Sequence, residues 1–519
     1  MIQPSITSLF LSVATVSGRS RGKTRYYLAS VVACVAMFLT VPCVAAESSI
    51  EDDAIRSSIQ RFLDAATTVS PGAVAIQVGD GIVMLSGTVS NLLQQDQAER
   101  IAESVPGVRS VVNDIRVQPI VRKNQAIAKD VHAVLARPRA DGLSDIAVKV
   151  NGGVVTLSGT VDSWVRSRLA AHKAMTVRGV SDIVNQIEVA PQGPRDDSAI
   201  QTDITRRLAA DLYVDASDIE VTVQDGRVIL KGSVQTAAER RRAVEDAWIS
   251  GVEAVQDRGL VVRRPQAARM KRPSSYIRQS DRAILQAVED ALHMDPRVNA
   301  ANPEVTVANG VVTLSGAVDT LYAKWAAEAD ALNTTGVWKV DNQLQFRYRS
   351  FPSDEEVERM IRDVLARDTE LHDQRIQLTV DDNHVYLSGW VESAGQRVRA
   401  ENVVAQVEGV LTLENRIKVF TKTDPVDDVD ITAAINDELF WSPYVDSDTI
   451  SVTVKDGRAA LKGHVANRFV ARIAVANAFE GGARRVRTIL ELKSGGTLAE
   501  DFREKPVTAG PGPALGLWR

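Results

Sequence analysis

The chain has 519 residues, 45% of them hydrophobic and 24% charged, which is the composition of ordinary globular domains. This balance excludes a wholly disordered chain and a chain embedded in a membrane along its length. The formal net charge is −5. Because the chain lacks the basic excess that binding to a phosphate backbone requires, we expect no nucleic-acid partner.

Residues 1–46 predict a secretory signal peptide. A basic segment at 19–25 precedes a mostly apolar run at 26–41, and small residues at 44–46 offer a cleavage site. Cleavage would remove 4 positive charges and no acidic ones, so the net charge would change from −5 to −9, and both cysteines would be lost. The alternative is a retained anchor at 26–46, since about 20 apolar residues span a bilayer.

After this leader, one pattern recurs six times: Val-x-(Asp/Asn/Gly)-(Gly/Asn)-x-x-x-Leu-x-Gly-x-Val. Its last glycines are Gly87, Gly159, Gly232, Gly316, Gly389 and Gly463. They are 72 to 84 residues apart, whereas solenoid repeats are roughly 20–50 residues long. The spacing therefore predicts a tandem array of one small, self-contained domain. Positions below are counted from this glycine.

Each repeat begins with a stripe of apolar residues at helical spacing. In the first repeat the stripe is Ile55, Ile59 and Leu63, and its last position, −24, is Leu in all six repeats. Apolar residues at i, i+4 and i+8 lie on one face of a helix. We therefore expect a first helix that packs on a sheet.

Two strands joined by a tight turn follow this helix. Turn pairs such as Asp80-Gly81 accept the positive φ angles of a type I′ turn. This turn sets −9 opposite −4 and −11 opposite −2, and these positions are apolar in every repeat. The alternation continues through the glycine to Val at +2, so the glycine is expected to point inward, toward a second helix.

The second helix is predicted by a capping residue and by small side chains. Position +4 is Asn, Ser or Thr in all repeats, and Gln94, Glu239 and Gln396 could complete capping boxes. Position +11 is Ala throughout, and a Gly-Val pair such as Gly107-Val108 introduces a third strand in most repeats. The fold class is therefore α+β: six α-β-β-α-β units, each a three-stranded mixed sheet with two helices on one face.

This arrangement resembles the BON domain (bacterial osmotic-stress and nodulation domain) in six copies over residues 50–494. The resemblance implies an envelope protein, usually periplasmic. It also implies an association with osmotic stress, with attachment to phospholipid or membrane surfaces, and with envelope integrity. The family has no single catalytic motif, so the resemblance carries no catalytic residue to this chain.

The repeats, linkers and tail have the following expected boundaries. The BON-like segments are 50–119, 124–191, 196–264, 280–348, 353–421 and 428–494, with a basic linker at 265–279 and a disordered tail at 495–519. The linker contains Arg269, Lys271 and Arg272. It is either a solvated spacer or a contact for anionic lipid head groups, which attract basic segments.

The sequence contains few candidates for catalytic or metal-binding residues. No ionisable residue recurs at one position in all six repeats, and the six histidines show no metal-ligand spacing. We therefore expect no catalytic residue, no cofactor, no metal and no small-molecule substrate. Trp325 and Trp248 lie off the alanine stripe of the second helices, and Trp164 lies near the start of one. They either form exposed contacts or pack between neighbouring repeats.

These observations favour a non-enzymatic, periplasmic binding array that attaches to phospholipid or envelope surfaces, or an inner-membrane protein with its bulk in the periplasm if residues 26–46 remain as an anchor. Tandem weak sites gain avidity through their effective concentration. Two alternatives stay open. One is an envelope scaffold or chaperone-like protein that binds other proteins, and the other is a sensor that responds to a solute or an ion.

Overall fold

The computed structural model describes residues 51–65, 69, 72–136, 142–190, 195–263, 279–299, 303–347, 352–420, 427–493 and 496–502. The leader, the basic linker and the tail after residue 502 lie outside these residues, so the expectations about them stay predictions. No helix in the described part of the chain is both long and apolar enough to cross a bilayer.

The first three repeats have the same order of elements. The first contains α2 (Asp52–Ala65), β1 (Val74–Gly79), β2 (Ile82–Val89), α3 (Leu92–Ser104) and β3 (Ser110–Val117). The second contains α4 (Asn124–Leu135), β4 (Ala147–Asn151), β5 (Val154–Val161), α5 (Trp164–Met175) and β6 (Asp182–Val189). The third contains α6 (Asp197–Ala210), β7 (Ile219–Gln224), β8 (Arg227–Val234), α7 (Ala237–Ala247) and β9 (Ala254–Val262).

The last three repeats keep this order with small additions. The fourth contains α8 (Asp281–Met294), α9 (Pro296–Asn299), β10 (Glu304–Ala308), β11 (Val311–Ser315), β12 (Ala317–Val318), α10 (Leu321–Leu332), β13 (Lys339–Asn342) and β14 (Gln345–Phe346). The fifth contains α11 (Asp354–Arg367), β15 (Arg375–Asp381), β16 (His384–Val391), α12 (Ala394–Ala405), β17 (Thr412–Asn415) and β18 (Lys418–Val419). The sixth contains α13 (Asp428–Trp441), β19 (Ile450–Lys455), β20 (Arg458–Val465), α14 (Arg468–Glu480), β21 (Arg485–Leu492), β22 (Thr497–Leu498) and β23 (Asp501–Phe502).

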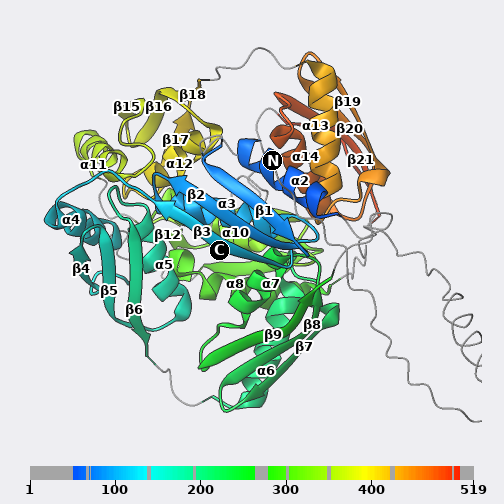
Figure 1. Cartoon of the computed structure of the whole chain (residues 1–519), viewed down its shortest axis with the longest axis horizontal. Helices are drawn as coiled ribbons and strands as arrows, with labels where there is room; N and C mark the ends of the chain where they lie inside the picture. The colour runs from blue at the N-terminus through cyan, green and yellow to red at the C-terminus, as the bar shows by residue number, and fades with distance from the viewer. Residues whose placement is uncertain are drawn as a thin grey trace, which may run out of the picture. The chain divides into compact units, whose positions relative to one another are not determined.

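The predicted sheet and its register are confirmed. In each repeat the first two strands pair antiparallel and the third pairs parallel with the second, so the second strand is central. Val78 lies opposite Val83 and Ile76 opposite Leu85. The turn pairs have positive φ in all six repeats, as a type I′ turn requires. Figure 1 shows α13 and α14 on the same side of the β19–β20–β21 sheet.

The predicted caps of the second helix are also confirmed. In all six repeats the side chain at +4 is the N-cap and accepts a hydrogen bond from the backbone N–H three residues later. The capping box is complete with Gln396. Gln94 and Glu239 instead accept from the backbone N–H of the residue before the cap.

The expected inward orientation of the repeated glycines is wrong. Four of the six glycines are exposed and two are half-buried. Their φ angles lie between 109° and 144°, a region that side chains disfavour. A Cβ on Gly232 would lie 1.8 Å from the carbonyl oxygen of Asp218 at the start of the paired strand. The positive φ therefore favours glycine at all six positions. A close approach to the paired strand adds to this at Gly87, Gly232, Gly389 and Gly463, and no atom of the second helix is among the nearest neighbours.

An asparagine breaks the regularity of the third strand in four repeats. Asn113, Asn185, Asn342 and Asn415 occupy the same position, +26. Each donates its side-chain amide to a backbone carbonyl of the second helix and accepts from the backbone N–H two residues later. The third strand lies at an open edge of the sheet, where backbone N–H groups lack a strand partner. The asparagine side chain gives one of these N–H groups an acceptor within the same strand.

The sixth repeat covers its third strand in another way. β22 and β23 pair antiparallel with β21, and Leu498 is buried in the core of this repeat. The expectation of a disordered tail from residue 495 is therefore wrong for residues 497–502. Residues 503–519 lie outside the described part of the chain.

Each repeat has its own apolar core, and some cores receive a side chain from another repeat. Trp441 of the sixth repeat packs in the core of the first, and Tyr213 of the third packs in the core of the sixth. The described residues accordingly lie within one compact unit. Contacts between repeats are thus part of the structure and not only consequences of the linkers.

Candidate functional site

The three tryptophans singled out from the sequence take part in packing between repeats. Trp164 of the second repeat lies against Trp248 of the third, with ring centroids 4.4 Å apart, and its Nε1 donates to the Val252 carbonyl at 3.2 Å. Trp325 of the fourth repeat packs against the core of the fifth. All three are half-buried. The structure thus assigns them to junctions and not to an exposed surface.

One acidic position does recur, although sequence reasoning passed over it because the second repeat has Asn there. At −35, in the first turn of the first helix, the residue is Asp in five repeats and Asn124 in the other. The carboxylate of Asp197 accepts from both N–H groups of the hairpin turn, at 2.8 Å from Asp225 and 2.9 Å from Gly226. The other aspartates bond their turns in the same way. This position is a clamp between helix and hairpin.

The clamp is expected to contribute to stability and not to binding. Asp197→Ala should destabilise the third repeat by about 1–3 kcal/mol, because two hydrogen bonds to a charged acceptor are lost and two turn donors lose their partner. The measurement is native-state hydrogen exchange of the β7–β8 amides. Asp196→Ala is the control, since Asp196 caps the same helix without a side-chain hydrogen bond. Equal effects of the two substitutions would contradict the clamp.

Two junctions between repeats use the same backbone geometry. The end of α6 in the third repeat pairs with the end of α10 in the fourth through an Asp211–Thr334 bridge. The end of α11 in the fifth repeat pairs with the end of α5 in the second through an Asp368–Val177 bridge. The residues occupy equivalent positions, −21 and +18. The repeats therefore join by a contact that the shared fold supplies at least twice.

Each of these bridging aspartates is held by an arginine of its own repeat. Arg242 Nε donates to Asp211 at 2.6 Å, and Arg399 bonds both carboxylate oxygens of Asp368 at 3.0 and 2.6 Å. The aspartate side chains are 2% and 3% exposed. A buried pair of this kind is costly to break, because removing one partner leaves an uncompensated buried charge.

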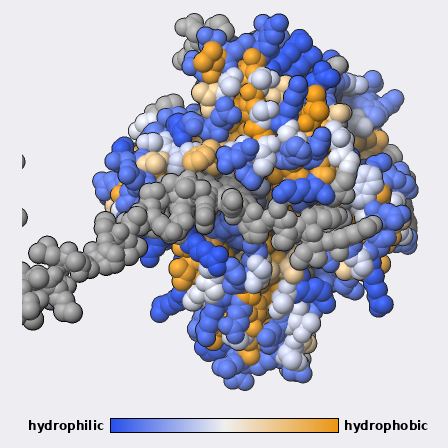
Figure 2. Space-filling view, turned by 90° about the vertical axis from the view of Figure 1, so that its right-hand side faces the viewer, coloured by the Kyte–Doolittle hydropathy of each residue, from blue (hydrophilic) through white to orange (hydrophobic). Residues whose placement is uncertain are grey.

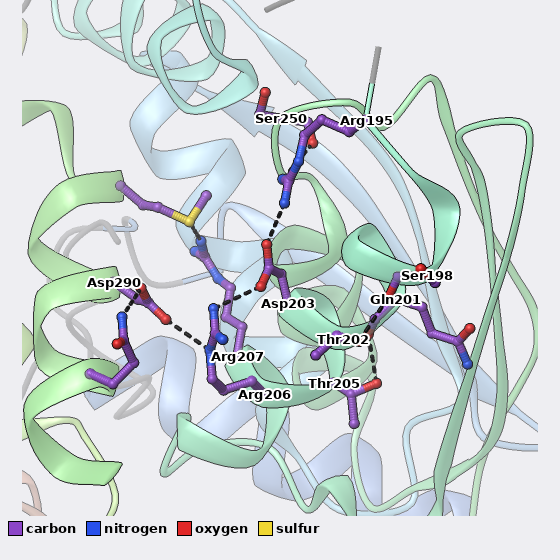
Figure 3. A network of polar contacts seen from close by, with 12 residues as sticks. Arg195, Ser198, Gln201, Thr202, Asp203, Thr205, Arg206, Arg207, Ser250 and Asp290 are labelled. Carbon is purple, nitrogen blue, oxygen red and sulfur yellow. Dashed lines mark hydrogen bonds and ion pairs between the residues drawn. The ribbon is translucent and has the colours of Figure 1, made fainter. Parts of the chain in front are cut away.

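A more exposed set of ion pairs links the first helices of the third and fourth repeats (Figure 3). Arg206 donates to Asp203 at 2.8 Å within α6 and to Asp290 of α8 at 2.9 Å. Arg195 also reaches Asp203, and it donates to the Ser250 carbonyl at 3.0 Å. Since Arg206 is 44% exposed, this pair contributes little to stability. The ion pair between Arg206 and Asp290 favours one orientation of α6 relative to α8.

Four buried carboxyl groups at or near these junctions have raised pKa values. Burial raises the pKa of Glu370 to about 7, although Arg399 opposes the shift, and Asp368 adds to it. Burial likewise raises the pKa of Glu239 to about 7 and that of Asp246 to about 6. It also raises the pKa of Glu103, which bonds Arg241 of the third repeat at 2.6 Å. Burial thus favours the protonated form of each of these carboxyl groups.

The sheet faces that point away from the helices carry exposed apolar side chains. On the fifth repeat, Tyr386 and Trp390 are 36% and 50% exposed. Arg416 lies 5.5 Å from the Tyr386 ring centre and Lys418 lies 5.3 Å from that of Trp390. Figure 2 shows apolar residues interspersed with hydrophilic ones on the face in view. Single exposed apolar residues are common, so only grouped residues indicate a contact.

Among the described residues, no group of three or more His, Cys, Asp or Glu side chains is arranged to hold a metal ion. The buried acids described above each have an arginine or a backbone N–H beside them. These arrangements satisfy charge and hydrogen bonding within the fold.

The comparison with known families decides what the repeats are. The model of the BON domain matches residues 51–119, 123–191, 196–264, 280–348, 353–420 and 427–490. The chain belongs to the BON domain family. Each BON repeat contains the hairpin, the repeated glycine and the capped second helix described above.

Two curated proteins are similar to parts of this BON array. "Osmotically-inducible protein Y" of Escherichia coli (strain K12) is 32% identical over 141 residues, which cover 26% of this chain and 70% of that protein. "Outer membrane lipoprotein DolP" of Haemophilus influenzae is 26% identical over 194 residues, which cover 37% of this chain and 89% of that protein.

Among solved structures, the chain is similar to that of CdsD, a structural protein of the Type III secretion system of Chlamydia trachomatis. The identity is 16%, the match covers 38% of this chain and 88% of that one, and the TM-score is 0.12. A score this low supports no further inference about the BON array.

Proposed function

We propose that the protein is a non-enzymatic, periplasmic binding protein that attaches to phospholipid surfaces of the envelope through several of its BON repeats. The observation that carries this proposal is the presence of six complete BON folds, each with its own core, in one chain. Weak sites held together in this way gain avidity without any single strong site.

Three further observations support the proposal. The leader at 1–46 has the pattern of a secretory signal peptide. One relative is named as osmotically inducible and another as an outer membrane lipoprotein. The shared positions of the repeats are occupied by glycines, caps, apolar residues and clamps, which build the fold and leave the exposed sheet faces free to differ. Differences between those faces are therefore where binding is expected to arise.

A protein-binding scaffold of the envelope is the second candidate, and the exposed face of the fifth repeat favours it. Trp390 and Tyr386 lie beside the cations Lys418 and Arg416, and the exposed Phe420 directly follows β18. Trp, Tyr and Arg are the residues that dominate binding energy at protein interfaces. Such a surface suits a partner protein with acidic groups around an apolar patch.

Vesicle binding separates these two candidates. The purified protein is expected to co-sediment with vesicles that contain anionic phospholipid, and to bind less to purely zwitterionic vesicles, because head-group charge attracts basic surfaces. The measurement is the bound fraction as a function of lipid concentration. No binding to either kind of vesicle would reject phospholipid attachment and leave the scaffold.

A further inference from the structure

The exposed sheet face of the sixth repeat carries a row of three positive residues that the equivalent positions of the other repeats lack. Lys455 on β19 lies directly opposite Arg458 on β20, and Arg458 lies directly opposite Arg485 on β21. Three positive side chains thus cross the sheet in one row. Since neighbouring strands are about 4.8 Å apart, these cations are held close together.

More cations extend this row along the strands. Arg487 and Lys462 point to the same face and are exposed, with Ile489, 38% exposed, opposite Lys462. None of the five cations makes an ion pair with a residue that the structure describes. Acids near them include Asp456, which follows Lys455 in the hairpin turn, and Asp501, opposite Arg487 on β23. Glu491 bonds His464 at 2.9 Å, and Asp428 bonds the backbone of the turn. These acids are fewer than the five cations and His464. The face therefore keeps a net positive charge.

The equivalent rows of the other repeats show that the fold does not require this charge. The three residues are Gly79, Ile82 and Ser110 in the first repeat; Asn151, Val154 and Asp182 in the second; Gln224, Arg227 and Ala254 in the third; Ala308, Val311 and Lys339 in the fourth; and Asp381, His384 and Thr412 in the fifth. Like charges directly opposite each other destabilise a sheet. A feature that opposes folding in one repeat alone points to binding at that repeat.

The following inference rests on the proposed function, which is attachment to phospholipid surfaces. We propose that the basic sheet face of the sixth repeat, formed by Lys455, Arg458, Lys462, Arg485 and Arg487, is the surface that docks on anionic phospholipid head groups. Charge complementarity selects an anionic partner. The exposed Ile489 amid the cations suits the boundary between head groups and acyl chains, where apolar side chains are buried.

Two features of the molecule fit a membrane better than a nucleic acid. Single-stranded nucleic acid is bound by aromatic side chains on which bases stack, and no Phe, Tyr or Trp is among the outward-facing residues of β19, β20 and β21. The acidic balance of the whole chain does not prevent docking, because charges beyond about 8 Å are largely screened at physiological ionic strength.

The test compares two variants of the full chain that lose the same charge. One carries Lys455→Gln, Arg458→Gln and Arg485→Gln. The other carries Arg116→Gln, Lys149→Gln and Lys339→Gln, three exposed cations on the sheets of three different repeats. The first variant is expected to bind anionic vesicles about 100-fold more weakly than the wild type, and the second nearly as well, since each cation near the surface contributes to attraction. The first variant should melt at the same or a higher temperature, because a like-charge row is removed.

Each outcome has a distinct meaning. Equal binding by the wild type and both variants would overturn the docking face while leaving phospholipid attachment intact. Absence of binding by the wild type would instead reject the proposed function. A third variant neutralises Arg269, Lys271 and Arg272, and a loss confined to that variant would assign the contact to the linker. Binding of duplex DNA that weakens equally in the first variant would overturn the assignment to lipid.

Discussion

Gly232→Ala is expected to destabilise the third BON repeat by about 3 kcal/mol or more, and Gly316→Ala to destabilise the fourth by about 1–2 kcal/mol. Both glycines have positive φ, 126° and 109°, so both substitutions strain the backbone. Only at Gly232 would the new Cβ also meet a backbone carbonyl, that of Asp218 at 1.8 Å. At Gly316 the nearest atom is 3.7 Å away.

The measurement is native-state hydrogen exchange, because six repeats in one chain do not unfold in a single two-state step. Protection of the β7–β8 amides reports on the third repeat, and protection of the β10–β11 amides reports on the fourth. Both sites share the strain of a positive φ. The difference between the two losses of stability therefore measures the cost of the close approach at Gly232. Equal losses at the two sites would show that the φ angle alone explains the glycine.

The sequence was sufficient to predict the fold of one repeat. The apolar stripe from Ile55 to Leu63, the turn at Asp80-Gly81 and the cap at Asn91 each depend on residues close in the chain. Local patterns of this kind determine helices, hairpins and register directly. The six internal copies strengthened the prediction, because a residue type that all six share at one position is required by the fold of the repeat.

The role of the repeated glycine could not be predicted in the same way. Alternation of inward and outward residues through Leu85 and Val89 places Gly87 on the inner face. The strand twists at this point instead, with a φ of 136°, and brings the glycine against the Ala73 carbonyl. The alternation of polar and apolar residues does not specify the φ angle of a glycine.

The junctions were outside the reach of sequence reasoning for a different reason, and the basic row was only partly within it. The bridge between Asp368 and Val177 joins residues of different repeats, and nothing in the local pattern pairs them. The row of Lys455, Arg458 and Arg485 becomes visible only once the register places them opposite one another. The signal that could have found this row was present, since the predicted hairpin already set −8 opposite −5.

Glu370→Gln is expected to stabilise the junction between the second and fifth repeats at pH 8 and to have little effect at pH 4. The folded protein raises the pKa of Glu370 from 4.5 to about 7, mainly through burial. The fold therefore favours the protonated form. The stability that this preference gives is fully present below pH 4.5 and is lost as the pH rises through 7.

The size of the effect follows from the same shift. A change from 4.5 to about 7 corresponds to about 3 kcal/mol between the acidic and alkaline limits. Gln is neutral at every pH, so the variant should keep at pH 8 the stability that the wild type loses. The ionised wild-type side chain adds a second negative charge beside Arg399, whose guanidinium already bonds both oxygens of Asp368.

Two backbone hydrogen bonds at this junction provide the measurement. Thr369 donates to the Thr176 carbonyl at 2.9 Å, and Arg178 donates to the Arg367 carbonyl at 3.1 Å. Hydrogen exchange of these two amides, corrected for the intrinsic rate at each pH, should slow in the variant at pH 8. Glu392→Gln, at an exposed position of the same repeat, is the control and should leave both amides unchanged. If Glu370→Gln accelerates exchange at pH 8, the ionised carboxylate holds the repeats together, and the junction tightens, not loosens, as the pH rises.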